Sequence, residues 1–200
     1  MNLFASEENE IHLDLPQADI VYYPSFISSE KASEYYNRIL SETEWQHDDI
    51  KVYGKVYKQP RLSALYGLNN DPYTYSGLTM LPKIFTPLLR ELKNKIEKIS
   101  ELTFNTVLIN QYRDGNDSVG WHSDDEKELG KNPVIASLTF GAERYFHLKH
   151  KTNKVLRNKL LLEHGSLLLM KGETQHYWQH QIPKSKVIQS PRINLTFRVI

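Results

Sequence analysis

Apolar residues recur with the period of an α-helix in two segments of the first half of the chain. The earlier helix should begin at Ser28 or Ser29, because a serine hydroxyl can accept a hydrogen bond from a free N–H group of the first turn. Glu30 then lies in that turn, where a negative charge interacts favourably with the helix dipole. Tyr35 and Leu40 fall on the apolar side of this expected helix.

The second helix is marked more strongly. It should begin at Pro82, because proline is favoured at the first helical position. Apolar side chains then follow at helical spacing: Ile84, Phe85, Leu88, Leu89, Leu92, Ile96 and Ile99. The opening of the chain, to about Phe26, has no such period and is expected to be extended or loosely ordered.

From Thr103 onward the pattern changes to short segments typical of strands, separated by turns that contain glycine. The expected strands are Thr106 to Tyr112, Val134 to Phe140, Tyr145 to His150, Lys159 to Glu163, Ser166 to Met170, His176 to Ile182 and Arg192 to Ile200. Helices followed by strands indicate an α+β domain, with sheets in a sandwich or open barrel and helices on one side. We expect residues 1–50 to form an N-terminal extension with the first helix, and residues 51–200 to form the main domain of one structural unit.

Charge and cysteine content narrow the classes of function. Lys and Arg number 25 and Asp and Glu number 24, so a net charge of +1 does not by itself indicate a nucleic-acid binder. The absence of cysteine excludes disulfides, zinc–thiolate sites and iron–sulfur clusters. The acidic N-terminus, interrupted by Pro16, resembles neither a signal peptide nor a membrane span. We therefore expect an intracellular protein with no membrane partner. We also expect the protein to act as a monomer.

His122 and Asp124 form the most informative short motif. A His and an Asp two residues apart can bind one face of a metal ion, and a second His would complete the facial triad of non-haem Fe(II) oxygenases, which leaves coordination positions open. Alone, this motif is weak, because it is common by chance. His176 and His180 share one face of an expected strand, so the strand pattern leaves either as the third ligand.

The last strand carries two arginines on one face. Side chains alternate along a strand, so four polar residues face one way, namely Arg192, Asn194, Thr196 and Arg198. Facing solvent, they would be unremarkable; facing a barrel interior, they would form a pocket for a dicarboxylate, because the arginine fork binds carboxylates bidentately. Asn110 and Tyr112 likewise share a face of an earlier strand and could bind an anionic ligand. The solvent-facing interpretation is the commoner one for either strand alone.

Several motifs, in order along the chain, carry a family resemblance. They are Asn110-Gln111-Tyr112, His122-Ser123-Asp124, Ile135-Ala136-Ser137-Leu138-Thr139-Phe140-Gly141-Ala142, Gly165-Ser166-Leu167-Leu168-Leu169-Met170, His180 followed by Pro183, and Pro191-Arg192-Ile193-Asn194-Leu195-Thr196-Phe197-Arg198. Together they resemble the AlkB family of Fe(II)/2-oxoglutarate-dependent dioxygenases, in particular the DNA-repair homologues of animals. The resemblance runs from about Val52 to the C-terminus and implies a double-stranded β-helix (jelly-roll) core with helices packed on one side.

The resemblance also implies a site and a reaction. The iron ligands would be His122, Asp124 and His180, and His176 would be a bystander. The residues matched to 2-oxoglutarate are Asn110, Tyr112, Arg192, Asn194, Thr196 and Arg198, with Arg192 on the distal carboxylate and Arg198 nearer the metal-chelating end. With Fe(II), 2-oxoglutarate and O2, the family oxidises methyl groups on bases such as 1-methyladenine and 3-methylcytosine, releasing formaldehyde, succinate and CO2. This implies repair of alkylated DNA, in the cytoplasm of a bacterium or the nucleus of a eukaryote.

Substrate contacts are implied as well, because reaching a base requires turning it out of the stack. Hairpins near residues 51–77 would recognise the nucleotide: Val52-Tyr53-Gly54-Lys55 matches a hairpin whose tip enters the gap, and Tyr73-Thr74-Tyr75 matches the segment around the flipped base. Asp125, with Glu126 as second choice, would favour a cationic methylated base. Candidate phosphate-binding cations form three groups, namely Lys51, Lys55, Lys58 and Arg61; Lys149, Lys151, Lys154, Arg157 and Lys159; and Lys184 and Lys186.

Two alternatives stay open at this point. The segment between Lys149 and Gly165 is shorter than in the animal duplex-repair homologue, so the resemblance does not separate single-stranded from double-stranded DNA, or DNA from RNA. A catalytically silent nucleic-acid-binding module would keep the barrel without turnover. It is disfavoured, because all the matched metal ligands and both arginines of the last strand are present.

Overall fold

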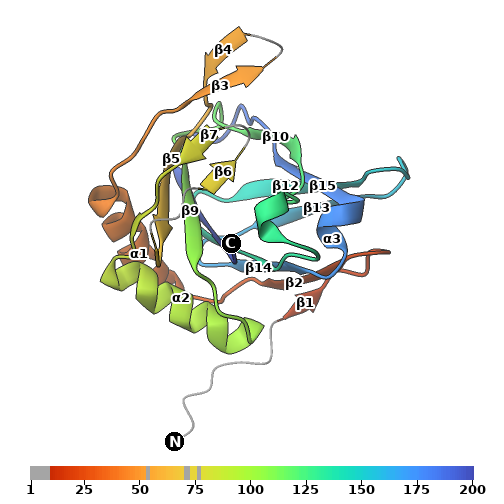
Figure 1. The fold of residues 1–200 in the computed structure, drawn as a ribbon, viewed down its shortest axis with the longest axis horizontal. Coiled ribbons are helices and arrows are strands. Elements are labelled where there is room, and N and C mark those ends of the chain that lie inside the picture. Colours follow the sequence, from red (N-terminus) through yellow and green to blue (C-terminus); the bar gives the residue numbers. More distant parts are fainter. Residues whose placement is uncertain (1–9, 53–54, 70–72, 76–77) are drawn as a thin grey trace, which may run out of the picture.

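Two β-sheets face each other in the computed structural model, which describes residues 10–52, 55–69, 73–75 and 78–200 (Figure 1). The larger sheet has eight strands in the order β1-β2-β14-β11-β16-β9-β5-β8. Their bounds are β1 (Ile11–His12), β2 (Asp19–Tyr23), β14 (Leu167–Lys171), β11 (Ile135–Gly141), β16 (Arg192–Arg198), β9 (Thr106–Tyr112), β5 (Leu62–Gly67) and β8 (Lys83–Ile84). All neighbours in it are antiparallel except β5 and β8.

The smaller sheet has four antiparallel strands in the order β10-β15-β12-β13, so that β10 and β13 are its edges. These are β10 (Val119–His122), β15 (Trp178–Ile182), β12 (Arg144–His150) and β13 (Arg157–Leu162). Two separate hairpins pair β3 (Asp49–Val52) with β4 (Lys55–Lys58) and β6 (Tyr73–Tyr75) with β7 (Leu78–Met80). The short helices are η2 (Lys127–Leu129) and α3 (Thr174–Tyr177).

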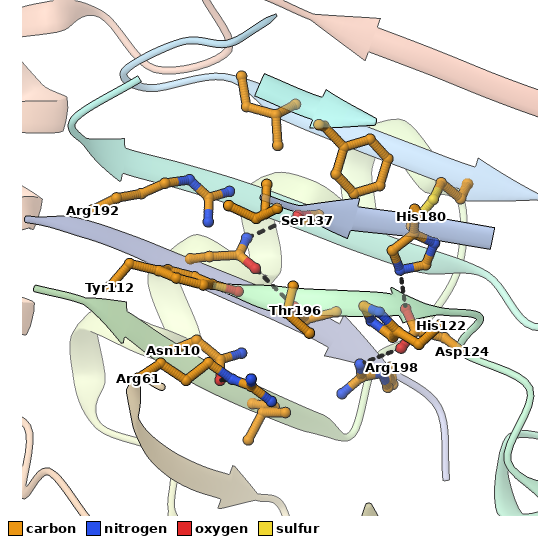
Figure 2. Close-up of a pocket in the computed structure, with 17 residues that line it drawn as sticks. Arg61, Asn110, Tyr112, His122, Asp124, Ser137, His180, Arg192, Thr196 and Arg198 are labelled. Atoms are coloured by element: carbon orange, nitrogen blue, oxygen red, sulfur yellow. Dashed lines mark hydrogen bonds and ion pairs between the residues drawn. The ribbon is translucent and has the colours of Figure 1, made fainter. Parts of the chain in front are cut away.

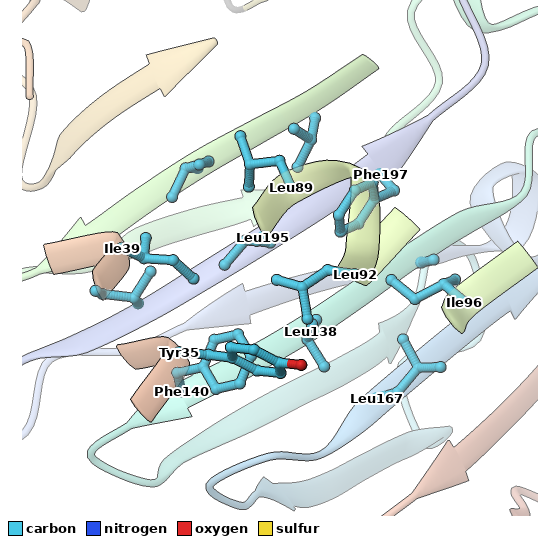
Figure 3. Packing of buried hydrophobic residues seen from close by; sticks show 14 of the residues in the cluster. Tyr35, Ile39, Leu89, Leu92, Ile96, Leu138, Phe140, Leu167, Leu195 and Phe197 are labelled. Atoms are coloured by element: carbon cyan, nitrogen blue, oxygen red, sulfur yellow. The ribbon is translucent and has the colours of Figure 1, made fainter. Parts of the chain in front are cut away.

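The alternation of side chains gives the large sheet two different faces. On one face, Leu195 and Phe197 of β16 pack under Tyr35 of α1 (Ser29–Glu42) and Leu92 of α2 (Pro87–Ser100), as Figure 3 shows. On the other face, apolar side chains such as Leu168 meet those of the small sheet in a second core. Facing sheets with both long helices on one side confirm the expected α+β jelly-roll arrangement. Neither long helix, at 14 residues each, has the length that crossing a bilayer requires.

The second helix begins later than predicted. It starts at Pro87, and Thr86 precedes it with its Oγ1 accepting a hydrogen bond from the N–H of Leu89 at 3.2 Å. The Thr-Pro pair therefore forms the N-terminus of α2, and Pro82 instead precedes the short strand β8. At α1, Ser28 is the N-terminal cap but its side chain makes no capping hydrogen bond, contrary to expectation.

The opening of the chain is extended, and part of it belongs to the large sheet. β2 pairs with β14 over five positions, including Val21 with Leu169, and Val21 and Tyr22 are both buried. Hydrogen bonds along a full strand hold this segment to the barrel. Residues from the first fifty thus complete the sheet and contribute to both cores.

Candidate active site

A polar cavity lies between the two sheets, lined by inward-facing side chains of both (Figure 2). β16 contributes Arg192, Asn194, Thr196 and Arg198 to it, while the alternate residues of this strand pack in the core beneath the helices. All seven residues of β16 are buried. The barrel-interior interpretation of this strand is therefore correct, and the solvent-facing one is not.

At one end of the cavity, His122, Asp124 and His180 bring their ligand atoms within 4.8 Å of one another. The pairing of β10 with β15 sets two of them opposite each other, because His122 is the register partner of His180. Nδ1 of His122 lies 2.8 Å from the carbonyl oxygen of Gly120, which can only accept, so Nδ1 carries the proton and Nε2 is left to bind a metal. Two neutral imidazoles and one carboxylate are the donor set that Fe(II) oxygenases use.

Neighbouring side chains fix these three residues. The N–H of Asp124 donates to Oε1 of the buried Gln175 at 2.9 Å, and Arg198 donates from Nη2 to Oδ1 of Asp124 at 2.7 Å. The ring of Phe146 stacks on His180, with centroids 5.0 Å apart and an interplanar angle of 25°. Such contacts hold metal ligands in their binding orientation.

The electrostatics also favour metal-binding protonation states. Burial alone would raise the pKa of Asp124, but the positive charge of Arg198 beside it brings that pKa down to about 2. Burial lowers the pKa of His180 to about 3, and burial likewise lowers the pKa of His122. At neutral pH the carboxylate is thus ionised and both imidazoles are neutral, as metal coordination requires.

At the other end, Arg192 is a buried cation that keeps two unused donors. Its Nη2 donates to Oγ1 of Thr139 at 2.9 Å, and its guanidinium lies 5.2 Å from the ring centroid of Tyr112. No described residue accepts a hydrogen bond from its Nε or Nη1, although burial hides both atoms from water. Burial lowers the pKa of Arg192 to about 10, which leaves it protonated at neutral pH. A buried fork with unused donors suits a carboxylate, so the cavity fits 2-oxoglutarate between this cation and a metal.

The other predicted cosubstrate residues line the space between the two ends. Asn194 donates from Nδ2 to Oγ of Ser137 at 2.8 Å, and Thr196 donates to Oδ1 of Asn194 at 3.2 Å. Asn110 accepts a hydrogen bond at Oδ1 from Nε of Arg61 at 2.9 Å. Arg61 is only 5% exposed and lines the cavity, so its predicted place among surface phosphate contacts is wrong.

Arg144, which is also buried, ties together two loops at the Tyr112 side of the cavity. It donates to the carbonyl oxygens of Asp114, Asp117 and Pro183 at 3.1, 3.0 and 2.6 Å. Its guanidinium also lies 5.8 Å from the Tyr112 ring centroid, so one arginine from each sheet, Arg144 of β12 and Arg192 of β16, lies near that ring. These contacts fix the loop that follows β9 against the segment that follows β15.

The predicted substrate contacts are spread over several places. Asp125 is exposed and forms an ion pair with Lys151, with Nζ 3.0 Å from Oδ2. Glu126 is half-buried, and burial raises the pKa of its carboxyl. Lys55 begins β4 and is exposed. Residues 73–75, predicted as Tyr73, Thr74 and Tyr75 around the base, form strand β6, whereas Tyr53 and Gly54 lie outside the described residues.

The prediction of a strand starting at His176 is wrong. His176 lies in the short helix α3, is exposed, and has its Nε2 2.8 Å from Oδ1 of Asn132, while the strand begins at Trp178. The sequence prediction missed Ser137 and Phe146, which line the cavity, and Thr139 and Gln175, which hydrogen-bond Arg192 and Asp124. Ser137 and Thr139 stand two apart in an otherwise apolar strand, and this polar alternation was the available signal. Nothing in the sequence pattern marks Gln175, which contacts Asp124 across 51 positions.

Residues 19–198 match the family model described as the 2OG-Fe(II) oxygenase superfamily. Over 190 residues the chain is 43% identical to the human alpha-ketoglutarate-dependent dioxygenase alkB homolog 3. This match covers 90% of this chain and 66% of the relative. The chain is also 41% identical over 182 residues to the human DNA oxidative demethylase ALKBH2, and this match covers 88% of this chain and 67% of the relative. The chain thus spans slightly less than two thirds of the first relative.

A solved structure, that of OsALKBH1, has the same fold. It superimposes with a TM-score of 0.64 at 19% sequence identity, covering 90% of this chain and 97% of that one. This likeness supports the jelly-roll architecture.

Proposed function

This chain belongs to the 2OG-Fe(II) oxygenase superfamily, and we propose that it removes methyl groups from ring nitrogens of nucleic-acid bases by oxidation, with alkylated DNA as its substrate. One observation carries the proposal. A single cavity has two imidazoles and a carboxylate at one end, and at the other a buried arginine whose Nε and Nη1 have no acceptor among the described residues. Similarity to a protein named DNA oxidative demethylase supports the choice of DNA.

Each end of the cavity has its own part in the reaction. Bound Fe(II) and 2-oxoglutarate, with O2, supply an oxidant that hydroxylates a C–H bond while 2-oxoglutarate becomes succinate and CO2. His122, Asp124 and His180 would hold the ion from one side, with Arg198 keeping Asp124 ionised and oriented. Arg192 would orient the cosubstrate through its distal carboxylate.

The group that is oxidised is a methyl group on a ring nitrogen of the substrate base. Insertion of one oxygen atom into a C–H bond of this methyl group gives an N-hydroxymethyl group. This group breaks at the C–N bond, so formaldehyde leaves and the nitrogen recovers its unmodified state. Methylation at such nitrogens makes the base cationic, and a carboxylate at the mouth of the cavity would favour it over the normal base. Asp125 would exchange its partner Lys151 for the base.

The decisive test measures succinate and formaldehyde together. The full chain, with Fe(II), 2-oxoglutarate and O2, should release both in equal amounts from methylated single-stranded DNA, and parallel reactions on duplex DNA and RNA would rank the polymers. Release from RNA alone would overturn the choice of DNA. No release from any polymer would instead support a catalytically silent binding module.

Asp124→Ala tests the metal site directly. We expect turnover to fall below detection, and we expect Mn(II) to lose its effect on the thermal unfolding midpoint, because a ligand raises that midpoint only if the folded state binds it. Asp14→Ala, the same substitution at an exposed aspartate between β1 and β2, is the matched control and should behave like wild type. Retained turnover in Asp124→Ala would rule out the proposed metal site.

We propose further that the protein acts as a monomer inside the cell, where its substrate is found. Its compartment would be the cytoplasm in a bacterium and the nucleus in a eukaryote. Sedimentation with and without DNA would test the monomer.

A further inference from the structure

The outward face of the four-stranded sheet takes no part in the site described above. Phe146 and Leu148 of β12 face the second core, so the alternate residues Tyr145, His147 and Lys149 face outward. Strand pairing places further side chains beside them, because residues directly paired across strands share a face. These are Lys159 and Arg157 of β13, opposite His147 and Lys149, and Gln181 and Gln179 of β15, opposite the same two residues. We call this surface the outer sheet face.

The charge on this surface is unbalanced. The four strands contain no Asp or Glu, although the chain has 24 acidic residues. They contain four Lys or Arg residues, of which Lys149, Arg157 and Lys159 face outward. In a chain with a net charge of +1, this surface is therefore locally positive.

Two aromatic rings lie among these cations. Nζ of Lys149 is 4.4 Å from the ring centroid of Trp121, and Nζ of Lys159 is 3.4 Å from that of Tyr145, which is 47% exposed. Two hollows of about 280 and 740 Å³ border the rings, one lined by Trp121 and the other by Tyr145. His147 and Lys159 line both hollows, so the two form one continuous surface.

This surface begins beside the candidate metal centre. β10 is an edge strand of the small sheet, and its residue His122 faces the cavity. The next residue before it, Trp121, faces the outer sheet face, where Lys149 covers its ring. Neighbouring residues of β10 therefore face the cavity and the outer sheet face.

We propose that the outer sheet face binds the single-stranded nucleic acid that flanks the base in the cavity, an inference that rests on the function proposed above. The cations would neutralise phosphates, and Trp121 and Tyr145 would stack on bases. Single-strand-binding proteins combine a positive groove with aromatic platforms in this way. On binding, each lysine would leave its ring for a phosphate, and a base would take the ring face that the lysine covers.

Another explanation accounts for part of the pattern. Charged residues on an edge strand prevent pairing with other chains, and β13 is an edge. This explains Arg157 and Lys159. It does not explain Lys149, which lies on the interior strand β12, or the two rings beneath lysines.

The test measures affinity for an unmethylated, fluorescein-labelled single strand of about 15 nucleotides, a length near the upper site size of related platforms. Tyr145→Ala should weaken binding about tenfold, because a stacked base is lost. Lys159→Ala should reduce the slope of log Kd against log salt by about 0.7, the value for one phosphate contact on a single strand. Lys95→Ala, which removes the same charge from the exposed face of α2, is the control and should match wild type.

Each other outcome has a definite meaning. Wild-type affinity and slope in Tyr145→Ala and Lys159→Ala would overturn the inference. Losses seen only when a duplex of the same sequence replaces the single strand would also overturn it. If Lys159→Ala aggregates while its affinity for the single strand is unchanged, the role of Lys159 is to prevent β13 from pairing with other chains. That result would also overturn the inference. Turnover of a methylated trinucleotide, too short to reach the outer sheet face, tests the proposed function separately. If it is absent while Tyr145-dependent binding persists, only the proposed function fails.

Discussion

Arg192 and Arg198 face the same cavity from the same strand, yet their surroundings give them different roles. Arg198 donates to Asp124, so its charge is matched by a protein carboxylate. Arg192 meets no carboxylate among the described residues; a threonine hydroxyl and the Tyr112 ring are its neighbours. A buried cation without a protein anion is costly, and a dianionic cosubstrate would supply the missing partner.

Arg192→Lys should separate charge from geometry at this position. Lysine keeps the charge but loses the planar fork, and one hydrogen bond to a charged group contributes about 1.5–3 kcal/mol, so the Kd for 2-oxoglutarate should rise at least about tenfold. The measurement is the shift of the thermal unfolding midpoint with 2-oxoglutarate in the presence of Mn(II). Arg38→Lys, the same substitution on the exposed side of α1, should leave this Kd unchanged. An unchanged Kd in Arg192→Lys would show that the fork does not bind the cosubstrate.

Residues of the site differed in how far the sequence could reveal them. The alternation along residues 192–198 correctly divided them into two faces, because a strand has only two, but it was the family resemblance that placed the polar face in the cavity. Arg61 and Gln175 could not be identified, because their partners Asn110 and Asp124 lie 49 and 51 positions away. Such contacts depend on how strands are brought together, and local pattern carries no information about it.

At the scale of elements, the sequence predicted both long helices and the start of α1 at Ser29, but not the start of α2. The apolar residues Ile84 and Phe85 fit the helical period of α2, although the helix begins only at Pro87. The start is decided by hydrogen bonding of the first free N–H groups, and Thr86 supplies the acceptor. Similarly, His176 and His180 have the spacing of two residues on one face of a strand. The strand begins only at Trp178, however, and His176 lies in the short helix α3.

Thr86→Ala should therefore destabilise the protein, whereas Ser28→Ala should not. Loss of a side-chain cap costs about 1 kcal/mol of unfolding free energy. Ser28 occupies the equivalent position of α1 but makes no such hydrogen bond, so its replacement should change stability by less than about 0.5 kcal/mol. Urea unfolding of the two variants beside wild type makes the comparison. Equal losses of unfolding free energy in the two variants would show that the Thr86 hydrogen bond does not stabilise the protein.

At the scale of the whole molecule, buried tyrosines join parts that are distant in sequence. Tyr22 of β2 donates to the Glu163 carboxylate at 2.9 Å and accepts from the Glu163 N–H at 3.1 Å. Tyr35 of α1 donates to Glu91 of α2. Burial raises the pKa of Tyr22 to about 12, and burial also raises the pKa of Tyr35.

These shifts predict loss of stability at alkaline pH. The unfolded chain loses phenol protons near the ordinary pKa of about 10, while the folded protein retains the Tyr22 proton until about pH 12. The folded state then holds more protons, so the free energy of unfolding should be steady below pH 10 and fall as pH rises from 10 to 12. Urea unfolding at pH 9, 10 and 11 measures this. Tyr22→Phe, with one titrating group fewer, should show a shallower fall, and an equal fall would mean that other groups cause it.

The pairing of β10 with β15 has one more consequence. The chain has no cysteine, so no disulfide can join two distant points of it. His122 and Asp124 on one side and His180 on the other are separated by a long stretch of sequence that includes β11 to β14. An ion bound by all three would close that stretch into a loop, as a disulfide does, but reversibly and at the pace of metal exchange. Iron supply in the cell would then govern how long the protein survives proteolysis as well as how fast it works.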